Sequence, residues 1–371
     1  MVTQHHKKGR KFIMVNNHVN NLNTLLKFDK DELFYKEYYE AKKDKTKLED
    51  FKKKYSYEYV TKNSFICPDI VIESEQLNNE HYNEHYIFDK IHHKQQVVLF
   101  KHPRYTPEFL HSHDYFELFY VLTGSCRHTI NNVTSVLKEG TLFFIAPNTN
   151  HSIGVFDDNS IVMNILIRKN FFKDFFLSTI SVENIISEFF LSNIFSQKKI
   201  ESLIFYNIGD ELKSIIKKML EEQNSSSDYY SYILNHLLAL FFFNLLRSNK
   251  NYCDIKIISK LDNDRAIKML SYIYDNYNQV SLESLSSTFN YSVEHCSRII
   301  KKELGKTFST LVQEIRLNKA KDYLIYTPMS VEAICYEVGY DSLSSFQRLF
   351  KKHYKLTPGL YREKNRKHQI I

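Results

Sequence analysis

Three histidines and a glutamate in the first half of the chain stand out for the chemistry they can do. His111, His113 and Glu117 form the pattern H-x-H-x-x-x-E, and His151 follows further along. Alternate residues of a strand share a face, so His111, His113 and Glu117 can point the same way. Imidazole and carboxylate groups are good ligands for a divalent transition metal. The spacing therefore predicts a clustered polar site that can hold a metal.

The segment from about Gln95 to Arg168 supplies the elements that must position this site. Short apolar runs alternate there with turn residues, namely VVLF, FELFYVL, SCRHTI, GTLFFIAP and SIVMNILI. Each run predicts a strand, and the regular spacing of the runs indicates a sandwich or small barrel.

A second set of candidate residues lies in the last third, where a pair of short helices occurs twice. Ser281 and Ser292 are placed to cap the first two helices, Ser330 and Ser342 the second two, and Gly305 can end one helix. The second helix of each pair presents a polar and basic face: Glu294, Ser297, Arg298, Lys301 and Lys302 in one, and Leu343, Ser344, Gln347, Arg348, Lys351 and Lys352 in the other. Helix pairs of this kind are typical of a helix-turn-helix, and two in tandem are a stronger signal than one.

The two pairs are joined by a predicted helix from Ser309 to about Ile325. Its apolar residues fall on two nearly opposite sides, with Leu311, Val312 and Ile315 on one side and Leu317, Ala320 and Leu324 on the other. This split predicts a rod between two separate cores. Such a rod is roughly 25 Å long, so two recognition helices can reach successive major grooves about 34 Å apart.

The stretch ICYEVGYDSLSSFQRLFKKHYKLTPGLYR, from Ile334 to Arg362, resembles the signature of AraC-type transcription regulators. The resemblance extends back to about Arg265. It implies base contacts by Glu294, Ser297, Arg298, Leu343, Ser344, Gln347 and Arg348, and phosphate contacts by Ser292, Lys301, Lys302, Ser342, Lys351 and Lys352. Arginine and glutamine can pair with base edges, whereas lysines neutralise phosphates without reading sequence. The chain departs from the family at Ser286, where alanine is usual, and at Lys355, where glycine is usual.

Residues from about Val97 to Arg168 resemble the cupin barrel, which precedes the DNA reader in many such regulators. The likeness implies a sensor whose effector site includes His111, His113, Glu117 and His151. The chain lacks the P-x-G-x-x-H pattern of cupin enzymes, because only three residues and no glycine separate Pro147 from His151. Three alternatives stay open: an organic effector alone, a divalent metal as ligand or cofactor, and ordinary polar residues at the mouth of a barrel.

The composition narrows the class of protein. The chain has 371 residues, with 43% hydrophobic and 25% charged, which indicates a globular protein of two or three domains. No apolar run is long enough for a membrane span. The net charge is +7, and nearly all of the excess lies after Asp264, as expected for a part that meets a polyanion. The five scattered cysteines indicate reduced thiols in a cytoplasmic protein.

The predicted fold class is therefore a multidomain α+β protein: a cupin-like β-barrel sensor, a helical linker or dimerisation region, and an all-α tandem helix-turn-helix domain. The expected divisions are a charged, helical and unassigned extension (1–90), the sensor (91–170), the helical linker (171–262) and the DNA-binding domain (263–371). The helix from Asp228 to Leu246 is apolar around most of its surface. It is predicted to be buried on several sides, within its own chain or in a homodimer.

The leading hypothesis is a cytoplasmic, sequence-specific transcription regulator, an activator rather than a repressor, and not an enzyme. Its expected partners are double-stranded DNA, a small-molecule effector, a second copy of the chain and RNA polymerase, with no membrane. One alternative is a metal-dependent cupin enzyme with a basic nucleic-acid-binding tail. Another is a basic adaptor that binds nucleic acid regardless of its sequence.

Overall fold

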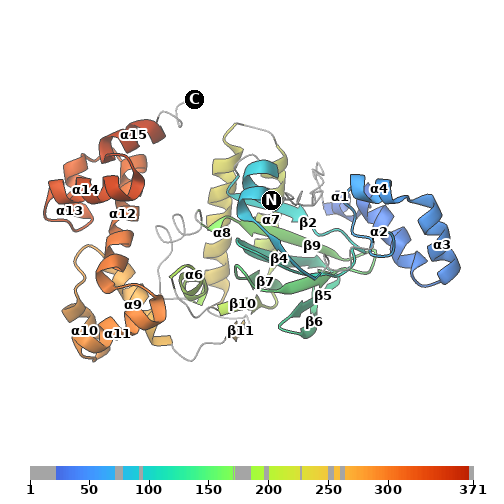
Figure 1. The fold of residues 1–371 in the computed structure, drawn as a ribbon, viewed down its shortest axis with the longest axis horizontal. Coiled ribbons are helices and arrows are strands. Elements are labelled where there is room, and N and C mark those ends of the chain that lie inside the picture. The colour runs from blue at the N-terminus through green and yellow to red at the C-terminus, as the bar shows by residue number, and fades with distance from the viewer. Residues whose placement is uncertain are drawn as a thin grey trace, which may run out of the picture. The chain divides into compact units, whose positions relative to one another are not determined.

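The structure is a computed structural model, shown in Figure 1. It describes residues 22–71, 78–91, 95–169, 171, 185–195, 200–225, 228–249, 255–259 and 264–366. Contacts divide the chain into two units. Unit 1 comprises Met1–Lys169 and Glu201–Ile258, and unit 2 comprises Asn170–Ile200 and Ser259–Ile371. The described residues between 22 and 90 therefore belong to the same unit as the predicted sensor.

Two β-sheets form the centre of unit 1. The first sheet has the strand order β1 (Asn78–Tyr82), β3 (Leu110–His113), β8 (His151–Gly154), β5 (Ser125–Ile130) and β6 (Val133–Lys138). The second has the order β11 (Ile255–Ser259), β10 (Ile200–Phe205), β7 (Leu142–Ile145), β4 (Phe116–Thr123), β9 (Ile161–Ile167) and β2 (Val97–Lys101). Strand β1 runs parallel to β3 and leads into the π-helix η1 (His85–Ile91).

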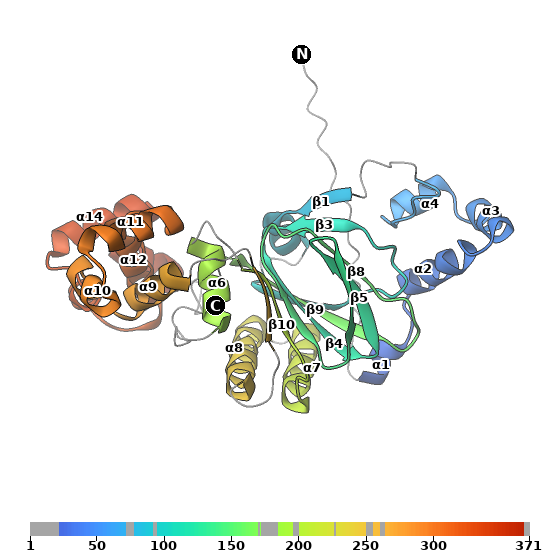
Figure 2. The same ribbon diagram turned by 90° about the horizontal axis from the view of Figure 1, so that it is seen from below.

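Alternating side chains fill both faces of the second sheet. Phe119 and Val121 of β4 share one apolar core with Cys126 of β5 and Ile153 of β8, so the two sheets pack face to face. On the opposite face, Phe144 of β7 lies 6.2 Å from the ring of Phe242 on helix α8 (Tyr230–Asn249). Figure 2 shows α8 and its neighbour α7 (Asp210–Asn224) beside this sheet. Because both faces are covered, β4 and β9 are buried along almost their whole length.

The five predicted strands are confirmed as β2, β4, β5, β7 and β9. The structure adds β3, β6 and β8 in the same segment, and β1 before it. The expectation that helices dominate from Phe171 to Leu261 is wrong at β10 and β11. Strand β10 forms because its apolar side chains complete the second sheet, where Ser202 pairs with Ile145 and Phe205 with Leu142.

The charged N-terminal segment, expected to be helical, forms three helices after the short α1 (Leu22–Leu26). They are α2 (Lys30–Ala41), α3 (Lys45–Lys54) and α4 (Tyr57–Lys62). Their core includes Phe34 and Tyr38, and it extends to Tyr105 and Phe109 next to the first sheet. These N-terminal helices are therefore packed onto the two β-sheets of unit 1.

Helix α8 is less buried within its own chain than its composition suggests. Leu238, Phe241 and Phe242 are buried, but Ile233 and Leu240 are 43% and 46% exposed. Within the single chain, α7 and the second sheet thus cover only part of this helix, and burial of the exposed stripe in a homodimer stays a prediction.

Unit 2 consists mainly of helices. They are α6 (Ile185–Phe195), α9 (Asp264–Asp275), α10 (Leu282–Phe289), α11 (Val293–Leu304), α12 (Phe308–Tyr326), α13 (Val331–Glu337), α14 (Leu343–Tyr354) and α15 (Pro358–Arg366). The four serines predicted as caps each accept a hydrogen bond from a backbone amide in the first turn of α10, α11, α13 or α14. Gly305 ends α11 with a φ of 70°. No described helix is long and apolar enough to cross a membrane.

Helix α12 joins two cores, as predicted. Leu311 and Ile315 pack into one core with α9, α10 and α11. Leu317, Ala320 and Leu324 pack into the other with α13 and α14. The apolar residues face two ways because each half of the rod supports a different helix-turn-helix unit.

Candidate ligand pocket and nucleic-acid interface

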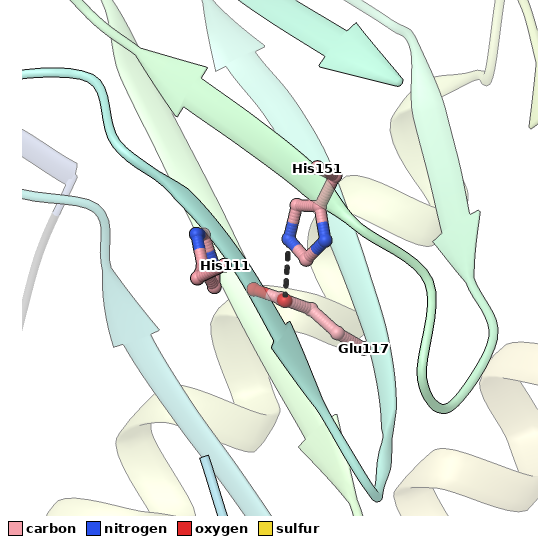
Figure 3. A group of neighbouring side chains, drawn as sticks. All are labelled: His111, Glu117 and His151. Carbon is pink, nitrogen blue, oxygen red and sulfur yellow. Dashed lines mark ion pairs between the residues drawn. The ribbon is translucent and has the colours of Figure 1, made fainter. Parts of the chain in front are cut away.

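Strands β3, β4 and β8 bring His111, Glu117 and His151 together between the two sheets (Figure 3). His111 and His151 are paired across β3 and β8, and their rings are 4.2 Å apart. Glu117 lies on the inward face of β4, like Phe119 and Val121. One ligand atom from each of the three lies within 4.8 Å of the others.

His113 and Asn164 complete the surroundings of the Glu117 carboxylate. His113 Nε2 lies 2.9 Å from Glu117 Oε2, and His151 Nε2 lies 3.4 Å from the same oxygen. The Asn164 amide donates to Oε1 at 2.9 Å. Sequence reasoning missed Asn164, although a polar residue in the apolar run of β9 was a usable signal.

The second nitrogen of each imidazole faces a backbone carbonyl. The Nδ1 atoms of His111, His113 and His151 lie 3.2, 2.8 and 3.1 Å from the carbonyl oxygens of Phe109, Tyr115 and Thr149. A carbonyl only accepts, so Nδ1 carries the proton and a neutral imidazole presents the lone pair of Nε2. The Nε2 atoms of His113 and His151 then both face the Glu117 carboxylate. A proton or a cation between these nitrogens and the carboxylate is needed to make the contacts favourable.

Burial and this geometry set the ionisation of the site. Burial would raise the pKa of Glu117, but the adjacent imidazoles of His113 and His151 hold it well below its ordinary value. Burial, together with the nearby His151, lowers the pKa of His111 well below the ordinary value, and burial also lowers that of His113. Burial thus disfavours the charged forms of His111 and His113, whereas the neighbours of Glu117 favour its charged form.

His111, Glu117 and Asn164 of this cluster line a pocket with about 590 Å³ of empty space, its open mouth included. Apolar side chains form much of the remaining wall: Tyr82, Ile87, Phe100, Phe109, Ile153 and Leu166. His102 also lines the pocket, and burial lowers its pKa to about 4. The Nε2 atom of His102 and the Oδ1 atom of Asn164 are buried without a hydrogen-bond partner. Sequence reasoning missed His102, which stands alone, with no second ligand at regular spacing.

The donor set fits a divalent transition metal. His111 and His151 can offer neutral nitrogen atoms and Glu117 a carboxylate oxygen, and the Nδ1–carbonyl contacts orient the rings as in protein metal sites. His113 lies beside the same carboxylate and is fully buried. The chemistry that a bound metal would supply here is charge compensation for Glu117 and an anchor for an oxygen or nitrogen group of an organic ligand.

The predicted base-reading residues lie on the solvent-facing sides of α11 and α14. Glu294, Arg298, Ser344, Gln347 and Arg348 are exposed. Ser297 and Leu343 are partly exposed.

The predicted phosphate-binding residues are also accessible. Ser292 and Ser342 are exposed at the first turns of α11 and α14, where free backbone amides favour an anion. Lys301, Lys302, Lys351 and Lys352 are exposed in the last turns of the same helices. Each recognition helix thus carries candidate phosphate contacts at both ends.

The two departures from the family pattern lie in α10, which precedes α11, and in the turn that follows α14. The Ser286 hydroxyl donates to the Tyr291 carbonyl at 2.5 Å, across the turn between α10 and α11. Lys355 follows α14 with a φ of 64°, a left-handed conformation that favours glycine.

Two family models match the chain. A model described as an AraC-like ligand binding domain matches residues 99–182, and one described as a helix-turn-helix domain matches residues 285–364.

Similar proteins include the HTH-type transcriptional activator RhaS of Mannheimia succiniciproducens, 26% identical over 73% of this chain and 95% of the relative. The uncharacterized HTH-type transcriptional regulator YfiF of Bacillus subtilis is 26% identical over 68% of this chain and 78% of its own length. The solved C-terminal domain of AraT, a response regulator from Geobacillus stearothermophilus, is 34% identical over 28% of this chain and 86% of that chain, with a TM-score of 0.27. The matched segments contain both the pocket strands and the two helix-turn-helix units. The chain therefore belongs to the AraC-type transcription regulators, with an AraC-like ligand-binding domain followed by a helix-turn-helix domain.

Proposed function

We propose that α11 and α14 each enter a major groove and together read a bipartite DNA site. The observation that carries this proposal is the shared rod α12, which buries one half in each helix-turn-helix core while both recognition helices keep polar faces exposed. Arg298, Gln347 and Arg348 are the strongest candidates for base contacts, because their side chains can bond two acceptors or a donor and an acceptor on one base. The lysines supply affinity that is independent of sequence.

Selection of bound fragments from random duplexes tests this proposal. The expected result is a motif with two half-sites about one helical turn apart. Enrichment without any shared motif would support instead the adaptor that ignores sequence.

Activation of transcription is the proposed outcome of binding, with RNA polymerase as the partner. The support is that RhaS, a relative along most of the chain, is named a transcriptional activator. In vitro transcription from a promoter carrying the selected site should rise when the protein is added. A fall in transcript would identify a repressor. This role places the protein in the cytoplasm, where bacterial DNA is transcribed.

The pocket is proposed to bind the effector, with His111, His113, Glu117 and His151 as its polar end. The excess of acceptor atoms around Glu117 favours a divalent metal over an organic effector alone. Metal analysis of the purified protein, with Glu117→Gln as the comparison, separates the alternatives. Stoichiometric metal that is lost in the variant supports the metal, and equal trace metal in both proteins supports an organic effector. The relatives are transcription regulators, which favours sensing over the catalysis of a cupin enzyme.

Helix α8 is proposed to form a homodimer. Large apolar side chains lie exposed along one side of this helix and at its start: Tyr229, Tyr232, Ile233, Leu240 and Phe243. A second copy would remove this stripe from water. Sedimentation equilibrium should show a dimer for the wild type and a monomer for Leu240→Lys. Val136→Lys, at an exposed apolar residue on β6, is the matched control and should leave the dimer intact. A monomeric wild type would exclude this interface.

A further inference from the structure

The two helix-turn-helix units touch at a second place besides the rod α12. The turn between α9 and α10 contains Tyr277 and Asn278, and the turn between α13 and α14 contains Gly339. A Cβ atom at Gly339 would lie only 2.1 Å from the carbonyl oxygen of Asn278. Gly339 also has a φ of 88°, which disfavours any other residue. The two turns are therefore in direct backbone contact.

Arg316, in the middle of α12, ties these turns together. Its Nε donates to the Tyr277 carbonyl at 2.8 Å, its Nη2 to the Asn278 carbonyl at 3.1 Å and its Nη1 to the Gly339 carbonyl at 2.6 Å. Two of the acceptor carbonyls belong to the first helix-turn-helix unit and one belongs to the second. Hydrogen bonds from a charged donor are stronger than neutral ones, and the planar guanidinium fixes the directions of its donors.

Aromatic packing surrounds this contact. The Tyr277 side chain packs against both helix-turn-helix cores. The guanidinium carbon of Arg316 lies 5.7 Å from the ring centroid of Tyr340, and Lys319 Nζ lies 5.6 Å from that of Tyr277. Burial lowers the pKa of Arg316, which nonetheless keeps its charge, as arginine does in proteins. The side chain is thus committed to the junction between the units.

We propose that Arg316 is a positioning residue for DNA reading, which fixes the distance and rotation between α11 and α14 and so selects the spacing of the two half-sites. A single helix can bend, so α12 alone leaves the angle between the units free to vary. The three carbonyl contacts remove that freedom. This inference rests on the proposed reading of a bipartite site.

The test uses the full chain and duplexes that carry its best selected site. In one series the half-sites are moved closer or further apart by one and two base pairs, and two further duplexes each keep a single half-site. The variants are Arg316→Ala and Arg316→Lys. The lysine keeps the positive charge but lacks the planar guanidinium that donates to three carbonyls at once. The control is Lys306→Ala, which removes one positive charge, as Arg316→Ala does. Lys306 forms an ion pair with Glu314 beside the first helix-turn-helix core.

The wild type and Lys306→Ala should prefer one spacing strongly. In both Arg316 variants, the ratio of affinities between the best spacing and the others should fall about tenfold, as expected for the loss of at least one charge-assisted hydrogen bond. Their affinity for single half-sites should equal that of the wild type. Wild-type spacing preference in both variants would overturn the proposal. Uniform loss on all duplexes, single half-sites included, would also overturn it, because Arg316 would then serve folding or phosphate binding. If the wild type itself showed no spacing preference, the bipartite reading would fail before the role of Arg316 was tested.

Discussion

Arg348 and Lys351 lie one turn apart on the exposed face of α14, yet they are expected to contribute to DNA binding in different ways. Arg348→Ala should cost roughly 1–3 kcal/mol of binding free energy on the cognate site and relax discrimination at one base pair. Lys351→Ala should weaken binding to all sequences alike and reduce the salt dependence by about one phosphate contact. Binding titrations on cognate and random duplexes at several salt concentrations measure both effects. Equal loss on the two duplexes for Arg348→Ala would contradict a base-reading role.

Lys355 shows how far a single residue can be interpreted from sequence. The AraC-type pattern usually has glycine at this position, and the φ of 64° is in the left-handed region that favours glycine. Lys355→Gly should raise the free energy of unfolding by about 1 kcal/mol, because a side chain disfavours the left-handed region. Urea titration followed by circular dichroism measures the change. The control is Asn290→Gly, because asparagine already tolerates the left-handed conformation at this position. Its free energy of unfolding should rise less than that of Lys355→Gly. Equal midpoints for Lys355→Gly and the wild type would show that this turn is unstrained.

Other residues could not be placed from the sequence because their partners are distant in the chain. Glu32 and Arg104 are charged residues of types that are mostly exposed in proteins, but both are fully buried in the structure. Asn164 likewise became part of the pocket only when β9 paired with β4. Local patterns predict which face a side chain occupies, whereas the pairing of strands and helices decides what it meets.

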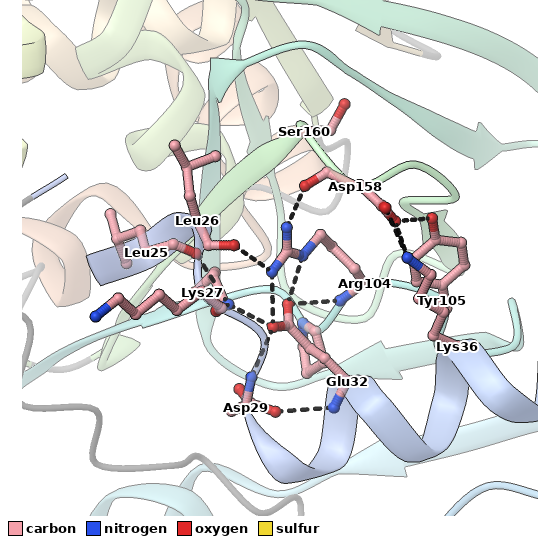
Figure 4. A network of polar contacts seen from close by, with 12 residues as sticks. Leu25, Leu26, Lys27, Asp29, Glu32, Lys36, Arg104, Tyr105, Asp158 and Ser160 are labelled. Carbon is pink, nitrogen blue, oxygen red and sulfur yellow. Dashed lines mark hydrogen bonds and ion pairs between the residues drawn. The ribbon is translucent and has the colours of Figure 1, made fainter. Parts of the chain in front are cut away.

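At the scale of elements, α2 is attached to the sheet unit by a buried ion network (Figure 4). The Glu32 carboxylate accepts from Arg104 Nε at 2.9 Å, from Arg104 Nη2 at 3.0 Å and from Lys101 Nζ at 2.6 Å. Arg104 also donates to the carbonyls of Leu26 and Asp158. One carboxylate thus holds the loop after β2, which continues into the pocket wall at His102 and Phe109.

Glu32→Gln should destabilise the fold by about 3–5 kcal/mol, because it leaves two cations buried without their counter-charge. Urea titration measures the loss. The control Glu49→Gln breaks an exposed pair with Lys52 and should cost less than about 1 kcal/mol. A loss for Glu32→Gln no larger than that of the control would show that the network contributes little.

The same network predicts that the free energy of unfolding depends on pH. Burial alone would raise the pKa of Glu32, but hydrogen bonds from Arg104 and the charge of Lys101 lower it below its ordinary value of 4.5. A group whose pKa is lowered by folding stabilises the native state above the unfolded pKa, and this contribution disappears as the pH falls through the folded pKa. The difference in unfolding free energy between wild type and Glu32→Gln should therefore shrink below about pH 4.5. A difference that stayed constant down to pH 3 would contradict this ionisation.

Elements with strong local signals were the ones that sequence predicted best. The serine caps, Gly305 and the two-sided apolar pattern of α12 are local features, and all are confirmed. Strand β10 was missed because Ile200–Phe205 becomes a strand only by pairing with β7, more than fifty residues earlier. Helix α8 was expected to be buried on several sides because composition shows apolar surface but not what covers it.

At the scale of the whole molecule, the chain combines a ligand pocket between two sheets with a pair of readers on one rod. One arrangement in each unit carries the proposed function: the acceptor atoms gathered around Glu117 in unit 1, and Arg316 with α12 in unit 2. A regulator couples such parts only if its effector binds one arrangement better than another. The effector should therefore change DNA affinity, and DNA should change effector affinity by the same factor.

Methylation protection of guanine N7 on the best selected duplex tests the central claim most directly, because this atom is exposed in the major groove. Two clusters of protected guanines are expected on one face of the duplex, about one helical turn apart, and Arg348→Ala should lose protection in only one of them. Protection of a single cluster, or of none, would contradict a chain that reads two successive grooves.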